Sequence, residues 1–313
     1  MRRALQSAGC ARRPNRVPLL RGLQGLTGIL EIATHALCYN ISGAEQPAHR
    51  SEPHAMTQPE HNPPSLDYSQ RDRWIWDTMT ALFERHALSA EDILRHWPAY
   101  ILRRDLPRFL AHYELFKKVV DLPGCVVELG VFKGASFFML ANLMETFCAG
   151  DRYRKVFGFD HFEGLKQDQF APEDGAPDAG VNKQAGGYRA TADEIRTLVA
   201  VHNADNLLPG AERCRLIEGD VMQTLPVFLE QNPGLKICYL HLDMDLYKPT
   251  RFALDLLYPL VVTGGVICFD EYGLMPWQGE TRAVDEFFAD FEKKPVIRKF
   301  PFHHLPHGYM IKE

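Results

Sequence analysis

The order of apolar and polar positions along the chain changes character near residue 123. From residue 68 to residue 120, apolar side chains recur at helical spacing, as in Met79, Leu82 and Phe83. After Pro123-Gly124, short apolar runs alternate with helical patterns to the end of the chain. Alternating strands and helices predict an α/β domain, in which helices cover both faces of a mostly parallel sheet.

Seven apolar runs after residue 123 are predicted to be strands, at 126–130, 156–160, 214–220, 237–243, 265–270, 295–302 and 308–312. Helices are predicted between them, at 135–147, 191–202, 223–231, 249–258 and 281–291. The last two strands are joined by a short turn, so they must be antiparallel, because parallel strands need a long crossover. The polar insert at 167–187 is long for a structureless connection and suggests a substrate lid.

The patterns divide the 313 residues into three parts. Residues 1–66 are predicted to be disordered, or to be upstream sequence read as protein, with Met56 as the alternative start. A targeting peptide is the other interpretation, because the segment is rich in arginine and has no acid before Glu31. Residues 67–120 are predicted to form a helical extension, and residues 121–313 are predicted to form the α/β domain.

Composition narrows the class of partner. The net charge of −5 and pI near 6.2 argue against binding to nucleic acid or to an anionic membrane. No run is long and apolar enough to span a membrane. The seven cysteines form no C-x-x-C pair, which is typical of a reducing, cytoplasmic location rather than a disulfide framework or zinc site. A homo-oligomer is left open.

Three strand ends carry candidate cofactor-binding residues, because ligands of open α/β sheets bind outside the carboxyl ends of the strands. The first strand leads from Glu128 into Gly130 and Gly134, which let the backbone turn and approach a ligand. The spacing is E-x-G-x-x-x-G, not the dinucleotide fingerprint, and a plain strand–helix turn is the alternative. Asp160 could bind a ribose hydroxyl and Asp220 an exocyclic amine, or each could cap the segment after it.

Four carboxylates follow the next two strands of the chain. Asp243 and Asp245 end one strand, and Asp270 and Glu271 end the other. Clustered charges are costly unless a cation neutralises them, and hard oxygen ligands suit Mg²⁺ or another divalent ion. The alternative is that some of them cap helices or pair with basic side chains nearby. His241 alternates with leucines in its strand, so we expect it to make a structural hydrogen bond.

Together these strand ends resemble the class I S-adenosylmethionine-dependent methyltransferases, and within them the macrocin O-methyltransferase family. The resemblance covers roughly residues 100–313. It lies in V-E-L-G-V-F-K-G-A-S, F-D-H-F-E-G-L, L-D-M-D-L-Y-K-P-T, and F-D-E-Y-G followed by W-Q-G-E-T-R-A-V-D-E-F-F. It implies a Rossmann-like fold with a seven-stranded, mostly parallel sheet whose last strand is antiparallel.

The resemblance also implies roles for individual residues. The cofactor-binding residues would be Glu128, Gly130, Gly134, Ser136, Asp160 and Asp220. The glycine loop would hold the methionine portion, Asp160 the ribose, and Asp220 would lie near the adenine. The metal ligands would be Asp243, Asp270 and Glu271. The family often has Asp-Asp where this chain has Asp270-Glu271, and Asp-Gly-Asp where Met244 stands between two aspartates.

The implied activity is methyl transfer from S-adenosylmethionine to a hydroxyl of a sugar or small natural-product-type acceptor. A divalent cation such as Mg²⁺ would lower the pKa of the hydroxyl, and a carboxylate would take its proton. Asp243 is the predicted base and Asp245 the alternative. Two rival interpretations are an enzyme similar to the cephalosporin hydroxylases and a non-catalytic cofactor-binding protein.

Overall fold

The computed structural model describes residues 68–303 and 305–313, so the predictions made for residues 1–66 lie outside the described residues. The chain divides into two compact units, Met1–His86 and Ala87–Glu313. The described part of the first unit is helix α1 (Tyr68–His86), which agrees with the helical spacing of its apolar residues. The domain boundary placed at residue 120 stays a prediction.

The second unit contains the elements of the α/β domain. Its helices are α2 (Ala90–Arg95), α3 (Trp97–Tyr100), α4 (Leu106–Phe116), α5 (Ala135–Cys148), α6 (Ala192–Ala204), α7 (Val221–Gln231), α8 (Tyr247–Leu257) and α9 (Gln278–Phe287). Its strands are β1 (Cys125–Leu129), β2 (Val156–Asp160), β3 (Cys214–Glu218), β4 (Ile237–Leu242), β5 (Val261–Phe269) and β6 (Gly308–Ile311). Within the described residues, no helix combines the length and the apolarity needed to cross a membrane.

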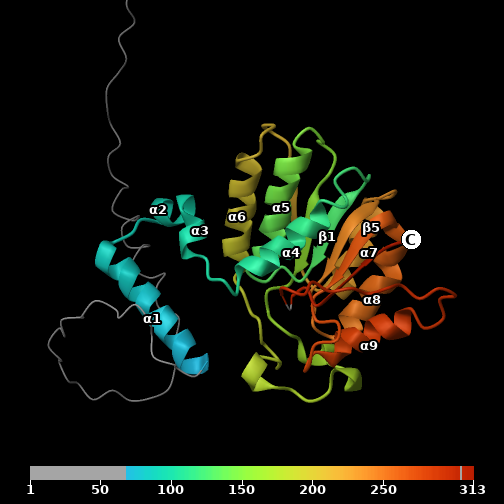
Figure 1. The fold of residues 1–313 in the computed structure, drawn as a ribbon. Coiled ribbons are helices and arrows are strands. Elements are labelled where there is room, and N and C mark those ends of the chain that lie inside the picture. The colour runs from blue at the N-terminus through green and yellow to red at the C-terminus, as the bar shows by residue number, and fades with distance from the viewer. Residues whose placement is uncertain (1–67, 304) are drawn as a thin grey trace, which may run out of the picture. The chain divides into compact units, whose positions relative to one another are not determined.

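The strands of the second unit form one sheet in the order β3-β2-β1-β4-β5-β6 (Figure 1). Neighbours are parallel except β5 and β6, which are antiparallel. The order reverses between β1 and β4, which opens a crevice at the carboxyl ends of the strands. The predicted Rossmann-like class, mostly parallel with an antiparallel last strand, is confirmed.

The predicted number of strands is wrong, because the described residues form six strands rather than seven. Residues 295–302 pair with β6 only through an isolated antiparallel bridge between Arg298 and Tyr309. Pro295 and Pro301 bound this segment. Proline has no backbone N–H to donate to a ladder, so it limits pairing to the residues between.

The core of the second unit lies in two layers, one on each face of the sheet. Successive residues of β1 divide between them, because strand side chains alternate. Val126 packs in the layer formed with α4, α5 and α6, and Val127 in the layer formed with α7, α8 and α9. Figure 1 shows α5 and α6 on one side of the sheet and α8 and α9 on the other. The carboxyl ends of the central strands remain open between these layers.

Candidate functional site

A cavity of about 360 Å³ lies at the carboxyl ends of the central strands. Its wall is formed by parts of the glycine loop, by the end of β2, and by the residues that follow β4 and β5. The predicted site residues that line it are Gly130, Ser136, Asp160, Asp243, Asp245, Asp270 and Glu271. The structure therefore brings the four predicted carboxylates and three of the candidate cofactor-binding residues to one cavity, whereas Glu128, Gly134 and Asp220 are not part of its lining.

The loop after β1 requires glycine at two of its predicted positions. Gly130 has a φ of +94°, and a Cβ there would lie 1.7 Å from the carbonyl oxygen of Asp243. Gly134 precedes α5 with a φ of +79°, and its Cβ would lie 2.5 Å from the ring of Phe138. A larger residue at Gly130 would push the loop away from the segment after β4, and one at Gly134 would collide with α5. The two glycines hold the backbone against the crevice, where a ligand can approach it.

Asp160, at the end of β2, fixes the conformation of this loop. Its carboxylate accepts hydrogen bonds from the backbone N–H groups of Val131 at 2.9 Å and Phe132 at 2.7 Å, and from Phe162 at 2.6 Å. Phe132 adopts a left-handed φ of +50°, which is uncommon for a bulky residue. The hydrogen bond to Asp160 helps to stabilise that conformation, and the contact with a ribose stays a prediction.

Asp220, after β3, caps helix α7, which is one of the two alternatives drawn from the sequence. Its Oδ1 accepts from the N–H of Met222 at 2.9 Å. Its Oδ2 accepts from Lys166 Nζ at 3.2 Å and from Gln169 Nε2 at 3.0 Å. The neighbouring residues Gly219 and Val221 line the cavity. The proximity of Asp220 to an adenine stays a prediction.

A buried chain of polar groups connects β1, β4 and β5 behind the cavity. Ser136 donates to Glu128 Oε1 at 3.1 Å, and His241 bridges Glu128 and Asp270 at 3.0 and 3.2 Å. Burial opposes the charged imidazole of His241, but its hydrogen bonds to Asp270 and Glu128 outweigh burial and raise its pKa to about 10. Each ring nitrogen lies within hydrogen-bond distance of a carboxylate oxygen. The structural hydrogen bond expected of His241 is confirmed.

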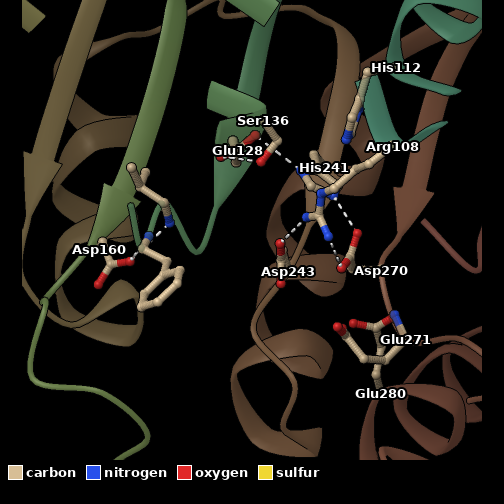
Figure 2. A network of polar contacts seen from close by, with 12 residues as sticks. Arg108, His112, Glu128, Ser136, Asp160, His241, Asp243, Asp270, Glu271 and Glu280 are labelled. Atoms are coloured by element: carbon tan, nitrogen blue, oxygen red, sulfur yellow. Dashed lines mark hydrogen bonds and ion pairs between the residues drawn. The ribbon is translucent and has the colours of Figure 1, made fainter. Parts of the chain in front are cut away.

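Arg108, on helix α4, is the main site residue that the sequence did not reveal. Its guanidinium contacts Asp243 Oδ2 at 2.8 Å and Asp270 Oδ2 at 3.0 Å (Figure 2). The signal in the sequence is the spacing of Arg108 and His112, which stand one helical turn apart. Both lie on α4, and His112 and Leu115 are buried residues of that helix. His112 is fully buried and contacts the hydroxyl of Tyr239 at 2.9 Å.

The four predicted carboxylates lie together, but they fall into two different environments. Asp270 contacts Arg108 and His241; burial opposes its ionisation, yet these two cations hold its pKa well below the usual range. Burial and the charge of Asp270 raise the pKa of Asp243 to about 7, although Arg108 opposes this shift. Burial and neighbouring carboxylates raise the pKa of both Asp245 and Glu271 well above the usual range.

Two groups of side chains are close enough to share a cation. One oxygen each from Asp243, Asp245 and Glu271 lie within 4.8 Å of one another. The same limit holds for His241, Asp243 and Asp270. The predicted ligand set of Asp243, Asp270 and Glu271 takes members from both groups, so it stays a prediction.

A further buried acid, Glu280 on helix α9, lies beneath Glu271. Its Oε1 accepts from the backbone N–H of Glu271 at 2.9 Å (the two side chains lie together in Figure 2). The Oε2 atoms of both glutamates are buried and have no hydrogen-bond partner among the described residues. Glu280 stands in the W-Q-G-E-T-R motif, and nothing in the sequence distinguishes it from an ordinary acid in the first turn of a helix.

The insert between β2 and α6 is held in place by two buried charged residues. Asp174 accepts from the backbone N–H of Tyr247 at 2.8 Å, and Lys183 donates to the carbonyls of Asp174 and Pro276. These contacts place Tyr188 in the cavity wall, edge-on to Phe132 at 5.8 Å between ring centroids. The insert therefore forms a fixed part of the wall in this structure. Its predicted role as a lid stays a prediction.

Comparison with known proteins shows what this arrangement is similar to. The family model described as Macrocin-O-methyltransferase (TylF) matches residues 104–298. Demethyldecarbamoylnovobiocin O-methyltransferase from Streptomyces niveus is 29% identical over 178 residues, which cover 55% of this chain and 61% of that protein. The 8-demethyl-8-(2,3-dimethoxy-alpha-L-rhamnosyl)-tetracenomycin-C 4'-O-methyltransferase from Streptomyces olivaceus is 29% identical over 156 residues, which cover 49% of this chain and 54% of that protein. The match thus spans little more than half the length of these curated relatives.

Among solved structures, the calicheamicin methyltransferase CalS11 has a TM-score of 0.69 and 22% identity, covering 85% of this chain and 99% of that one. An apo structure of CalS11, described as a TDP-rhamnose 3'-O-methyltransferase, has a TM-score of 0.62 and 24% identity, covering 80% of this chain and 96% of that one. At these identities, the similarity shows a shared fold.

Proposed function

This chain belongs to the macrocin O-methyltransferase family, and we propose that it transfers a methyl group from S-adenosylmethionine to a hydroxyl of a small acceptor, with the help of a divalent cation. The acceptor is a sugar or a natural product of similar chemistry. One observation carries the proposal, namely that the glycine loop and the acidic cluster line one cavity. The two curated relatives are O-methyltransferases, one of demethyldecarbamoylnovobiocin and the other of a rhamnosyl-tetracenomycin C.

The cofactor would lie on the side of the cavity formed by β1, β2 and β3. The backbone around Gly130 would receive its methionine portion, because no side chain separates that backbone from the cavity. Asp160 lines the cavity beside the loop that it fixes, and would meet the ribose. Glu128 and Ser136 hydrogen-bond to each other beneath the loop and would support it. Asp220 caps α7 and would lie near the adenine.

The residues at the ends of β4 and β5 fit a divalent cation. All the donors of the Asp243, Asp245 and Glu271 group are carboxylate oxygens, which suit a hard ion such as Mg²⁺. The buried Oε2 of Glu271 lacks a hydrogen-bond partner among the described residues, and a cation would satisfy it. When bound, the ion would supply Lewis-acid chemistry to the acceptor hydroxyl. Asp243 and Glu271 belong both to this group and to the predicted ligand set with Asp270.

The protein's own part in the reaction is to orient the acceptor and accept a proton. When bound, S-adenosylmethionine would supply the methyl group, which would pass to the acceptor oxygen as its bond to sulfur breaks. Asp243 lies in the cavity wall and would take the proton of the hydroxyl, with Asp245 as the alternative. Holding the oxygen in line with the methyl group supplies much of the rate, because it converts a bimolecular encounter into a local one.

The aromatic wall opposite the acids would contact the acceptor. Phe132 and Tyr188 line the cavity and are 38% and 37% exposed. Ligand pockets use such aromatic surfaces for contact and a few polar groups for orientation. Burial and the nearby negative charges, chiefly those of Asp245 and Glu271, raise the pKa of the Tyr188 hydroxyl to about 12. An acceptor between them would touch the ring on one side and the carboxylates on the other.

The proposal extends to the cell compartment. The cysteines that the structure describes, Cys125, Cys148, Cys214, Cys238 and Cys268, are all free thiols. Free, mostly buried thiols support a reducing and therefore cytoplasmic location. A small-molecule acceptor also agrees with the net charge of −5, which does not attract nucleic acid.

The experiment that tests the proposal separates cofactor binding from transfer. Calorimetry with S-adenosylmethionine is run in EDTA and in Mg²⁺, and transfer of a labelled methyl group is then screened against hydroxylated sugars and glycosides. We expect binding in both buffers, and transfer only with Mg²⁺. Absence of cofactor binding would contradict the methyltransferase assignment. Transfer that continues in EDTA would contradict the role of the metal and leave the methyltransferase intact.

A further inference from the structure

Arg108 occupies the part of the site where a divalent cation is expected. Its two terminal nitrogens contact Asp243 and Asp270 at 2.8 and 3.0 Å, and its side chain is 20% exposed. Figure 2 shows the guanidinium between the two carboxylates, with His241 behind it. An arginine that binds two carboxylates at once in a mostly buried site is a strong ionic contact, because both nitrogens donate in a fixed geometry.

The helix that carries Arg108 is fixed by its own packing. Ala111, Leu115 and Phe116 of α4 are completely buried, and α4 packs against α5. Arg108 stands before these residues and extends toward the carboxyl ends of β4 and β5, which are neighbouring strands. The packing of α4 therefore places the guanidinium beside the acids.

The acids of the cluster differ in how many of their carboxylate oxygens have a partner. Both oxygens of Asp270 are engaged, Oδ2 by Arg108 and Oδ1 by His241. Asp243 gives Oδ2 to Arg108. Two predicted metal ligands are thus already neutralised by the protein, whereas the Oε2 of Glu271 has no hydrogen-bond partner among the described residues.

We propose that Arg108 is an internal counter-ion that competes with the divalent cation for Asp243 and Asp270. This inference rests on the proposed function, because it concerns the cation of that same site. In the absence of metal, Arg108 keeps the acidic cluster stable. When a metal ion binds, Arg108 releases or shares these oxygens, so the metal affinity of the site is lower than its carboxylates alone would give.

The direction of the effect follows from charge. A guanidinium and a divalent ion repel each other, and they do so more strongly in a mostly buried site than in water. A residue that only positioned the ligands would weaken metal binding when removed. A competing cation has the opposite signature, because its removal frees two carboxylates and lowers the positive charge that the metal must approach.

The test uses the full chain and Mn²⁺ as the probe, with binding measured by calorimetry and by the electron paramagnetic resonance of free Mn²⁺. Arg108→Met removes the guanidinium and keeps much of the side-chain bulk. Arg103→Met is the matched control, because Arg103 is exposed and precedes the same helix. We expect Arg108→Met to bind Mn²⁺ about tenfold more tightly than the wild type, and Arg103→Met to bind it unchanged. Equal or weaker binding by Arg108→Met would overturn the proposal.

Thermal unfolding supplies a second measurement. In EDTA, we expect Arg108→Met to unfold at a lower temperature than the wild type, because it leaves two carboxylates without their cation. Saturating Mn²⁺ should raise its unfolding temperature by more than that of the wild type. If Arg108→Met folds only with Mn²⁺, that result supports the proposal, and an equal gain in both proteins contradicts it.

Arg108→Lys covers the case in which the methionine variant does not fold at all. A single ammonium keeps the charge but cannot present two nitrogens, one to each carboxylate. The Mn²⁺ affinity of Arg108→Lys should therefore lie between those of the wild type and Arg108→Met. Affinity below that of the wild type would contradict competition. S-adenosylmethionine binding is measured on the same samples. Its absence from every protein would contradict the proposed function, whereas unchanged Mn²⁺ affinity with normal cofactor binding would contradict only the role of Arg108.

Discussion

The acids on the two halves of the sheet end the same kind of strand, yet they are neutralised in different ways. Asp160, after β2, accepts three backbone N–H groups, and Asp220, after β3, caps a helix. Asp243 and Asp270, after β4 and β5, depend on the side chains of Arg108 and His241 instead. Backbone donors are fixed by the fold, whereas side-chain cations can be replaced by another cation.

This difference suggests that the two halves of the cavity have different roles. The half formed by β1, β2 and β3 (the cofactor half) would bind the cofactor, and the half formed by β4 and β5 (the reactive half) would carry out the chemistry. Backbone N–H groups hold Asp160 and the glycine loop in a single arrangement, which suits a cofactor of constant shape. The half formed by β4 and β5 keeps buried carboxyl oxygens without partners among the described residues, which is costly for stability. Such costs are tolerated at sites where charged groups take part in chemistry.

Removing Asp243 should have the largest effect on activity. This effect should be confined to the reactive half, so that methyl transfer falls and cofactor binding does not. We expect Asp243→Ala to lower kcat/KM for methyl transfer about a thousandfold, because it removes both a metal ligand and the proposed base. Cofactor affinity should change little, since Asp160 and the glycine loop are untouched. Labelled-methyl transfer and calorimetry measure the two quantities separately.

Asp290→Ala is the control for this variant, because Asp290 is an exposed acid outside the cavity wall. It should retain full activity. Normal transfer by Asp243→Ala would contradict the assignment of Asp243, and loss of cofactor binding along with transfer would show that the two halves do not act separately.

Removing Asp160 should produce the opposite pattern. Its carboxylate accepts from Val131, Phe132 and Phe162, so Asp160→Ala leaves backbone donors unsatisfied and releases the left-handed Phe132. We expect the free energy of unfolding to fall by about 2–4 kcal/mol, and cofactor affinity to fall with it. Urea unfolding and cofactor titration measure these effects. Unchanged cofactor affinity in a destabilised protein would show that Asp160 supports the fold without shaping the cofactor site.

The positions of these acids could be predicted from the sequence, but their partners could not. The alternation of strands and helices places Asp160, Asp243 and Asp270 at strand ends, and parallel strands bring those ends to one edge of the sheet. Arg108 reaches Asp243 across 135 positions of the chain. Such a contact depends on how α4 packs, which local periodicity does not reveal.

Local rules also failed where a boundary depended on tertiary contacts. The segment 295–302 has the apolar pattern of a strand, yet only Arg298 pairs with Tyr309. The insert at 167–187 looked like a loop because of its polar composition, but Asp174 and Lys183 are buried within it. A buried charge in a polar segment has the same appearance in sequence as an exposed one, since its burial is set by residues such as Tyr247 and Pro276.

Tyr188 joins the two halves and provides a test of moderate size. Its ring contacts Phe132 of the glycine loop, and it lines the same cavity as the acids after β4 and β5. We expect Tyr188→Ala to raise the acceptor KM about tenfold while cofactor affinity stays constant, because a lost aromatic contact affects mainly the ligand that touches it. Tyr188→Phe is the control and should resemble the wild type. A rise in cofactor Kd without a change in acceptor KM would assign the ring to the cofactor side instead.

The smallest effect should come from Lys166, a side-chain cation on the half formed by β1, β2 and β3. Lys166 contacts Asp220 at 3.2 Å, but Asp220 also accepts from Gln169 and from the backbone N–H of Met222. Because these donors remain, Lys166→Met should lower the free energy of unfolding by less than about 1 kcal/mol. Cofactor affinity should change by less than about threefold, and urea unfolding with cofactor titration measures both. A larger loss would mean that this half, like the reactive half, depends on a side-chain cation, and the contrast between backbone and side-chain neutralisation would not hold.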